Sequence, residues 1–154
     1  MRLINFWNDR IVAVLASRWA EGAALLLLRI ALAGIFWRSG RSKVSEGSLI
    51  EISDSTRYLF ENDYAGVPLP PEIAAPLATA SEHLFPALLV IGLTTRLSAA
   101  ALLSITIVIQ VFVYPEAWWT THILWAAMAI ILIVRGGGML SIDMLVGRLT
   151  RADE

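Results

Sequence analysis

The 154-residue sequence contains no cysteine and only two histidines. Without cysteine, the chain cannot carry out thiol–disulfide chemistry, hold an iron–sulfur cluster on its own thiolates or form a structural disulfide. Charged residues are also scarce, at 16%, where a soluble domain has about a quarter. The net charge is −1 and no basic aromatic face is present, so we expect no nucleic-acid partner. We also expect no metal site.

Hydrophobic residues make up 57% of the chain and are concentrated in four long blocks. Each block approaches the roughly 20 residues that cross a hydrocarbon core of about 30 Å. We therefore expect membrane spans at about residues 22–38, 73–93, 97–114 and 118–134. The predicted fold is all-α, an integral membrane, antiparallel four-helix bundle formed by residues 21–147, followed by a cytoplasmic tail at 148–154.

The first twenty residues predict an amphipathic helix that lies in the headgroup plane before the first span. The apolar face of this helix consists of Leu3, Ile4, Trp7, Ile11, Val14 and Leu15. A frayed, solvated tail is the alternative. Polar residues interrupt any signal-peptide core and no small-residue cleavage site follows, so we expect no cleaved signal.

Basic residues indicate the orientation of the bundle. Arginines precede the first span, lie in the turn after the second and follow the fourth: Arg2, Arg10, Arg18, Arg96, Arg135, Arg148 and Arg151. Under the positive-inside rule both termini are cytoplasmic, and the long loop at 39–72 lies outside the membrane. The loop has basic residues of its own but also six acidic ones. We expect it to cover the outer mouth of the bundle, with a short helix that begins after Ser53.

Two charged residues lie deep inside the predicted spans, Arg29 in the first and Glu82 in the second. A charge at the bilayer centre costs about 2.5–3.5 kcal/mol on insertion scales, so such residues pair or serve a function. The two depths agree to within about two helical turns, and we expect Arg29 to bind Glu82, directly or through water. Pro86 leaves the Glu82 carbonyl without its helical donor and predicts a kink there. An ion pair that only fixes helix packing is the alternative.

Four further polar residues complete the candidate site for a ligand, proton or ion: His83, Gln110, Tyr114 and His122. Gln110, Tyr114 and His122 predict a polar pocket that opens outward beneath the long loop. Ordinary hydrogen bonds between helices are the alternative. His83 lies on a face of small residues that suits close helix contact. The two histidines fall at different depths, which argues against a haem held between them.

Several short motifs follow one another along the chain. In order they are Phe36…Gly40…Lys43, Gly66 with Pro68, Glu82, the turn Gly92…Arg96, and Gly136…Asp143. This ordered set resembles the DoxX family of small four-span bacterial membrane proteins, over residues 21–147. The resemblance implies a bundle in the bacterial inner membrane. Some relatives are linked to thiosulfate oxidation with a quinone as acceptor, and others to partners that handle thiols and oxidative stress. Phe85 and Pro86 stand where relatives more often have glycines.

The resemblance implies a membrane subunit or anchor of a redox system, with a quinone and an oxidoreductase as partners. We do not expect the chain to be an enzyme alone, because it has no evident catalytic constellation and no thiol. A small transporter or exporter of protons or a polar solute is the alternative, and a purely structural assembly protein is another. The small residues Ala31, Gly34 and Ala99 suit the helix contacts of a homodimer.

Overall fold

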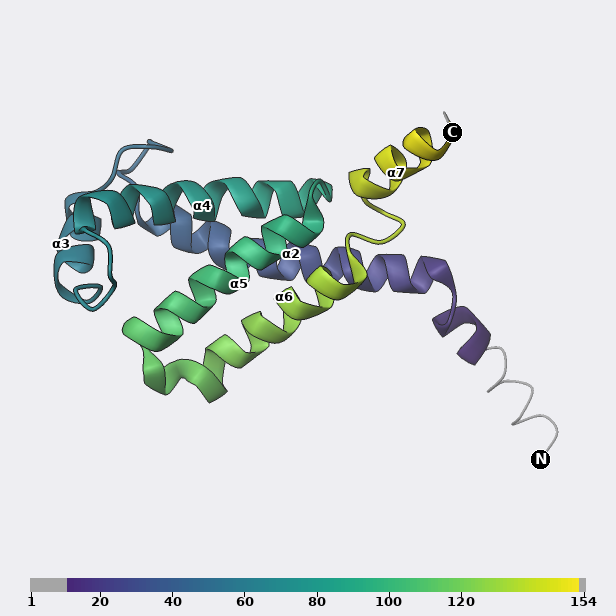
Figure 1. Ribbon diagram of the computed structural model, residues 1–154, viewed down its shortest axis with the longest axis horizontal. Helices are drawn as coiled ribbons and strands as arrows, with labels where there is room; N and C mark the ends of the chain where they lie inside the picture. Colours follow the sequence, from purple (N-terminus) through teal and green to yellow (C-terminus); the bar gives the residue numbers. More distant parts are fainter. Residues whose placement is uncertain (1–10, 153–154) are drawn as a thin grey trace.

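The computed structural model describes residues 11–152, and within that range the chain is helical and contains no β-strand (Figure 1). Three of the long apolar helices are α2 (Arg18–Ser42), α4 (Pro71–Ile91) and α5 (Thr95–Phe112). A fourth apolar segment, Pro115–Arg135, comprises two short turns, η1 (Pro115–Ala117) and η2 (Trp118–His122), and α6 (Ile123–Arg135). All four are long and apolar enough to span a membrane, which confirms the predicted all-α class.

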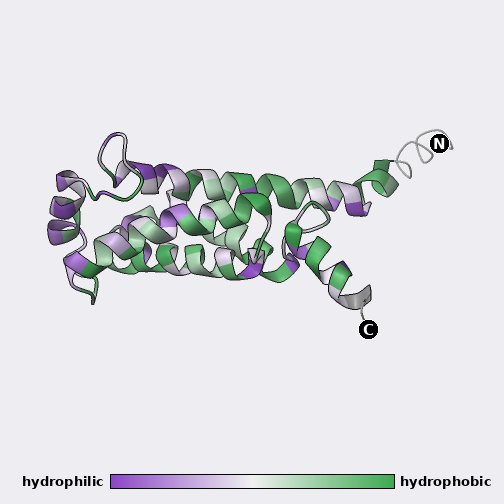
Figure 2. Cartoon of the chain, turned by 90° about the horizontal axis from the view of Figure 1, so that it is seen from above, coloured by the Kyte–Doolittle hydropathy of each residue, from purple (hydrophilic) through white to green (hydrophobic). Residues whose placement is uncertain are grey.

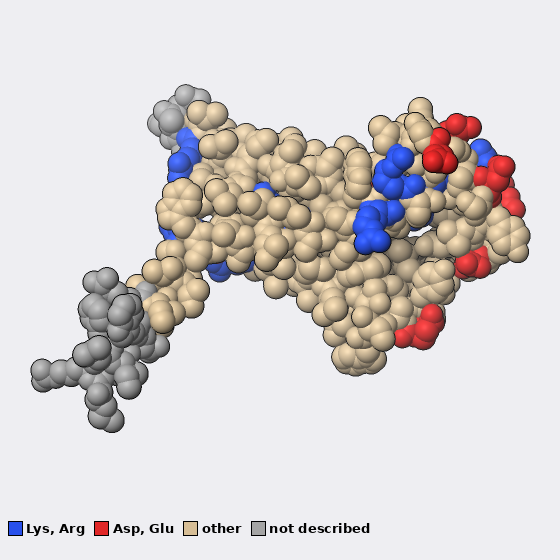
Figure 3. All heavy atoms as spheres, turned by 180° about the vertical axis from the view of Figure 1, so that it is seen from behind, with Lys and Arg blue, Asp and Glu red and all other residues tan. Residues whose placement is uncertain are grey.

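The outer surface of the bundle is apolar along its middle and polar at its ends. Figure 2 shows hydrophobic residues along the long helices and hydrophilic ones concentrated in the connections. Large apolar side chains such as Leu27, Leu84, Ile107 and Leu124 are exposed on these helices. On the face drawn in Figure 3, charged atoms are sparse along the middle and gather toward the two ends. These apolar faces contact lipid, since the four helices are apolar enough to span a membrane and soluble monomers rarely expose large apolar patches.

Most predicted span boundaries agree with the structure to within a few residues. The second and third helices begin and end two residues earlier than predicted. The first helix is four residues longer at each end than the predicted 22–38. It begins after Ser17, whose hydroxyl accepts a hydrogen bond from the Ala20 N–H at 3.2 Å.

The predicted interfacial helix does not continue to residue 20. Its first ten residues lie outside the described range, and residues 11–15 are helical. The extended backbone of Ser17, with φ −72° and ψ 149°, separates this turn from α2. Local capping chemistry therefore ends one helix and starts the next.

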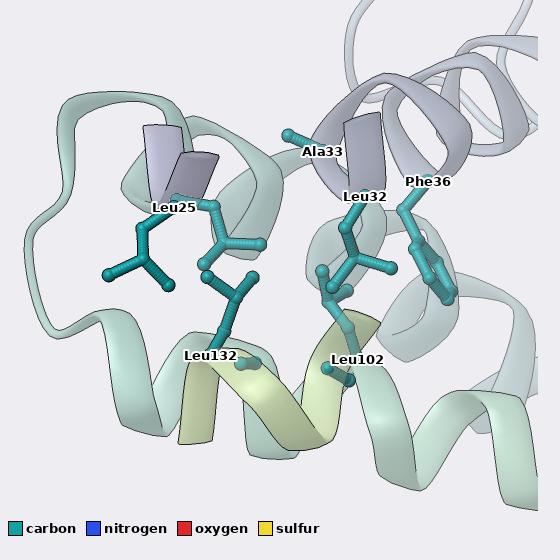
Figure 4. Packing of buried hydrophobic residues seen from close by; sticks show 9 residues of the cluster. Leu25, Leu32, Ala33, Phe36, Leu102 and Leu132 are labelled. Carbon is teal, nitrogen blue, oxygen red and sulfur yellow. The ribbon is translucent and has the colours of Figure 1, made fainter. Parts of the chain in front are cut away.

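The four long segments pack in a ring, with α2 against α4, α4 against α5, α5 against α6 and α6 back against α2. Their shared core includes Leu25, Leu32 and Phe36 of α2, Leu102 of α5 and Leu132 of α6, which converge in Figure 4. Ala99 is fully buried in the same core. It therefore cannot support a homodimer contact as predicted, whereas Ala31 and Gly34 lie on an exposed face of α2.

The connection between α2 and α4 folds over one end of the bundle, which we call the loop end. As expected, Ser53 caps the short helix α3 (Asp54–Asn62), accepting a hydrogen bond from the Thr56 N–H at 3.3 Å. Phe60 of α3 is buried against Ala74 and Ala75 at the start of α4. The loop thus covers the part of α4 that extends beyond the end of α2.

The opposite end, which we call the terminal end, contains the α4–α5 turn, the end of α6 and the helix α7 (Ile142–Ala152). Ser141 caps α7 and accepts a hydrogen bond from the Met144 N–H at 3.3 Å. The predicted tail at 148–154 is therefore not separate from the preceding helix, because α7 continues through Ala152. Leu145 and Leu149 of α7 are exposed.

Candidate functional site

Glu82 is buried in α4, and its ion-pair partner is Lys43. The Lys43 Nζ lies 2.7 Å from the Glu82 Oε2, and side-chain exposures of 6% and 1% show that both charges are removed from solvent. Lys43 also donates to the Ser39 hydroxyl at 2.8 Å. It is the only lysine in the chain. One ammonium therefore neutralises one buried carboxylate, as a low-dielectric environment requires.

The predicted ion pair between Arg29 and Glu82 is wrong. The Arg29 Nη1 donates to the Gly137 carbonyl at 2.8 Å, and its Nη2 donates to the Val90 carbonyl at 3.3 Å. Arg29 is nevertheless fully buried, as expected for a charge inside a bundle. Backbone carbonyls at the terminal end, and not a carboxylate, accept from its two terminal nitrogens, while its Nε is buried without a partner in the described part of the chain.

The axial position of α2 along α4 explains this difference. Gly40 lies against Glu82, and Gly92 lies against Arg29, so ten residues of α4 separate the two levels. At 1.5 Å per residue this separation is about 15 Å. The predicted first span began at residue 22, and Arg29 and Glu82 were expected at similar depths in the first and second spans. Instead α2 begins at Arg18 and is displaced toward the terminal end, which brings Lys43 to the level of Glu82.

Gly40 allows the close approach that positions this ion pair. A Cβ atom on Gly40 would lie 3.0 Å from the His83 ring and 3.1 Å from the Glu82 carbonyl oxygen. Pro86 has no N–H to bond that carbonyl, and it is fully buried in α4. Gly40 and Lys43 are three residues apart, so they share one face of α2. The glycine thus contacts α4 and the lysine binds its carboxylate.

Replacing Gly40 with Ala is expected to destabilise the protein, although alanine favours a helix more than glycine does. The methyl group would force apart α2 and α4, and such overpacking costs about 1–3 kcal/mol. Gly34→Ala is the matched control, because a Cβ on Gly34 meets nothing within 4 Å. We expect the control to be neutral or slightly stabilising. Denaturant titration in detergent measures both, and equal stability of the two variants would contradict the close contact.

A cavity of ≈ 300 Å³ lies between the loop, α4 and α5, with Glu82 on its wall. We call it the lateral cavity. Apolar side chains dominate its wall, among them Phe60, Phe85 and Ala101. The lining residues Leu77 and Ser104 are exposed on the lipid-facing surface. The cavity is therefore accessible from the hydrocarbon side, between α4 and α5.

Tyr64, in the loop after α3, contributes a hydrogen-bond donor to the lateral cavity. Its ring stacks on Phe60 with 4.4 Å between centroids. Burial raises the pKa of Tyr64 above its usual range, and the Glu82 carboxylate raises it further. A tyrosine hydroxyl is already protonated at neutral pH, and this shift of the pKa favours the protonated form further. No local pattern in the sequence points to this residue, because its position depends on how the loop folds back onto α4.

Two of the three residues predicted to line an outward polar pocket, Gln110 and His122, lie within hydrogen-bonding distance of each other. Gln110 Oε1 lies 2.7 Å from the Nδ1 of His122, and its Nε2 donates to the Pro115 carbonyl at 2.8 Å. These side chains close the connection between α5 and α6, and none of the three lines the lateral cavity. The alternative of ordinary hydrogen bonding between helices describes Gln110 and His122. Of the six predicted ligand residues, only Glu82 lines this cavity.

His83 faces α2 instead of the lateral cavity. Its Nδ1 is 2.7 Å from the Thr79 carbonyl, and its ring meets Trp37 edge-on with centroids 5.1 Å apart. Its Nε2 is buried without a partner in the described part of the chain.

The loop residue Gly66 lies close to the end of α5, since a Cβ on Gly66 would be 3.3 Å from the Phe112 carbonyl oxygen. Pro68 lies in the same loop and is exposed.

A second polar cluster joins distant parts of the chain at the terminal end. Asp143 accepts hydrogen bonds from the backbone N–H groups of Thr94 at 2.7 Å and Thr95 at 2.8 Å, and so caps the start of α5. Thr94 adopts φ +50°, an uncommon conformation for a β-branched residue. Asp143 in turn donates its N–H to the Gly92 carbonyl at 2.9 Å. The α4–α5 turn is therefore held by the segment that follows α6.

Arg96 fastens the same region to α6. Its Nη1 donates to the Ile133 carbonyl at 2.5 Å, and its guanidinium lies beside Gly136. Gly136 ends α6 with φ +77°. The motifs that stand apart in the sequence, Gly92…Arg96 and Gly136…Asp143, thus form one contact surface around Arg29.

The four apolar segments and their packing in a ring define a multi-pass membrane protein with a four-helix bundle. The model of the DoxX family matches residues 24–115. The chain belongs to the DoxX family. An uncharacterized protein of Haemophilus influenzae is 33% identical over 145 residues, covering 84% of this chain and 87% of that protein. No solved structure matches the chain significantly.

Proposed function

We propose that this DoxX-family protein is the membrane subunit of a redox system and that its lateral cavity binds the headgroup of a quinone. The supporting observation is the wall of the cavity, where aliphatic and aromatic side chains surround one carboxylate and a few hydroxyl groups. Such a wall is typical of small-molecule sites. A volume of ≈ 300 Å³ suits a one- or two-ring headgroup, and the lipid-facing opening leaves a path for a long apolar tail.

The side chains of the cavity supply the contacts that such a headgroup needs. Phe60 and Phe85 offer aromatic surface to the ring, and the protonated Tyr64 hydroxyl can donate to a ring carbonyl. A quinone becomes a quinol by taking up two electrons and two protons. Lys43 forms an ion pair with Glu82 at the wall. We assign its ammonium group the delivery of both protons in turn, with a proton taken up from the aqueous side at the loop end after each transfer.

The electrons come, in this proposal, from a partner oxidoreductase. The chain has no cysteine and therefore no thiol–disulfide pair through which to pass electrons itself. Membership of the DoxX family favours the bacterial inner membrane. The arginines of the terminal end favour an orientation with both termini in the cytoplasm, under the positive-inside rule. The loop end, where α3 covers the lateral cavity, then lies on the side of the membrane opposite the cytoplasm.

Quinone binding is tested by filling the lateral cavity. Ala101→Phe is expected to weaken binding of a short-tailed quinone analogue by at least about tenfold, because the ring occupies the space of the headgroup. Quenching of tryptophan fluorescence in the detergent-purified protein measures the affinity. Ala31→Phe is the matched control, since Ala31 lies on an exposed face of α2, and it should bind as the parent does. Equal binding by both variants would overturn the proposal.

A transporter of protons or a polar solute is the competing function, and the buried pair of Lys43 and Glu82 is the observation that favours it. Proton flux into vesicles that contain the purified protein separates the two. We expect no flux above that of empty vesicles. Flux that is present without quinone and lost in Glu82→Gln would establish the transporter instead.

A further inference from the structure

A second and larger cavity, of ≈ 940 Å³, opens at the terminal end between α7 and the bundle. We call it the terminal cavity. Its charged lining residues are Arg18, Arg96, Arg135, Arg148, Glu21 and Asp143. We propose that it binds the phosphate group of an anionic phospholipid. This site lies at the opposite end of the bundle from the lateral cavity and does not depend on the proposed redox function.

The lining of the terminal cavity is positively charged and its acids are already engaged. Four arginines and two acids give the lining a net charge of +2. Glu21 forms an ion pair with Arg135. Both carboxylate oxygens of Asp143 accept backbone N–H groups of the α4–α5 turn.

Three guanidinium groups of the terminal cavity therefore remain available to an anion. None of Arg18, Arg96 and Arg148 forms an ion pair with a carboxylate among residues 11–152. Arg96 uses one donor on the Ile133 carbonyl and keeps its others. Guanidinium forks match the oxygens of a phosphate, with two parallel hydrogen bonds for each arginine.

A buried hydroxyl in the same wall also lacks a partner. Thr95 is 0% exposed and lines the terminal cavity, and its Oγ1 has no hydrogen-bond partner in the described part of the chain. An unsatisfied buried hydroxyl costs about 1–3 kcal/mol, so it is expected to meet a ligand or water.

The depth of the terminal cavity selects a lipid as the source of the phosphate. The cavity lies where the apolar helices α2 and α6 begin or end, which is the level of the headgroups. The neighbouring α7 exposes Leu145, Val146 and Leu149. An amphipathic helix buries such a face at the boundary of headgroups and acyl chains. A phospholipid in this position puts its phosphate among the arginines and its chains beside α7.

Binding is tested by titrating the full-length protein in neutral detergent with phosphatidylglycerol and, separately, with phosphatidylcholine of the same acyl chains. Native mass spectrometry counts the bound lipids. We expect phosphatidylglycerol to bind more tightly and its affinity to fall as salt is raised. Arg96→Gln and Arg148→Gln should each weaken it about fivefold, and together about 25-fold. Arg57→Gln, in the exposed helix α3, is the matched control and should change nothing.

Three results would overturn the proposal. The first is equal affinity for the two lipids in the parent protein, a measurement that needs no variant to fold. The second is an equal loss of phosphatidylglycerol binding in the Arg57→Gln control. The third is saturation of the site by inorganic phosphate at the same concentration as the lipid, which would make it a site for a free anion.

Discussion

Replacing Lys43 with Met is expected to destabilise the bundle by about 3–5 kcal/mol, because it leaves the carboxylate of Glu82 buried without a counter-charge. Glu82 is 1% exposed, and its Oε2 accepts a hydrogen bond from Lys43. The unpaired acid must then either draw water into the bundle or take up a proton. Reversible unfolding in detergent, followed by helical circular dichroism, measures the loss.

A second substitution separates the charge from the packing of Lys43. The double variant Lys43→Met with Glu82→Gln removes both charges and should recover most of the stability lost in the single variant. Arg57→Met provides the control for loss of a basic residue. Its partner Asp54 is 4.0 Å away and fully exposed, so we expect a change of at most about 1 kcal/mol. A Lys43→Met variant as stable as the parent would contradict a buried ion pair.

The second large effect is expected at Gly92, where Ala should cost about 3 kcal/mol. Gly92 ends α4 with φ +72°, a conformation that costs an L-residue about 1 kcal/mol. A Cβ there would also lie 2.5 Å from the Nη1 of Arg29 and 2.8 Å from the Cα of Ser141. Since the Ser141 contact is with backbone, the segment that carries Asp143 must shift, and this overpacking adds about 1–3 kcal/mol.

Gly47 offers a control that isolates this packing cost. It also has positive φ, at +80°, but a Cβ on Gly47 meets nothing within 4 Å. Gly47→Ala should therefore lose only the backbone term of about 1 kcal/mol. Equal losses in the two variants would show that Arg29 and Ser141 do not press against Gly92.

The helices themselves could be predicted from local signals in the sequence. The apolar blocks predict the ends of the four spans to within four residues, because hydropathy reports directly on which residues face lipid. Ser53 starts α3 and Ser141 starts α7, as their capping chemistry indicates. These features depend on residues close together in the chain.

The pairing of the buried charges could not be predicted in the same way. Hydropathy shows that Arg29 and Glu82 are inside the bundle but says nothing about how far α2 is displaced along α4. Lys43 was assigned to the loop because it follows the last apolar residues of the first span. The available signal was the spacing of three residues between Gly40 and Lys43, which puts both on the helix face that contacts α4. Asp143 caps the start of α5 by accepting the N–H groups of Thr94 and Thr95, which lie nearly fifty positions earlier in the chain. No local sequence pattern predicts such a contact.

The contact between Lys43 and Glu82 can be measured directly, because Lys43 is the only lysine in the chain. Labelling lysine with ¹⁵N gives a single Nζ resonance in solid-state NMR of the protein in lipid bilayers, and labelling glutamate carboxyl carbons with ¹³C supplies the partner. The structure predicts a strong dipolar coupling between them, consistent with the 2.7 Å N–O distance and lost in Glu82→Gln. A lysine Nζ without coupling to any glutamate, together with an Arg29 guanidinium coupled to Glu82, would contradict it.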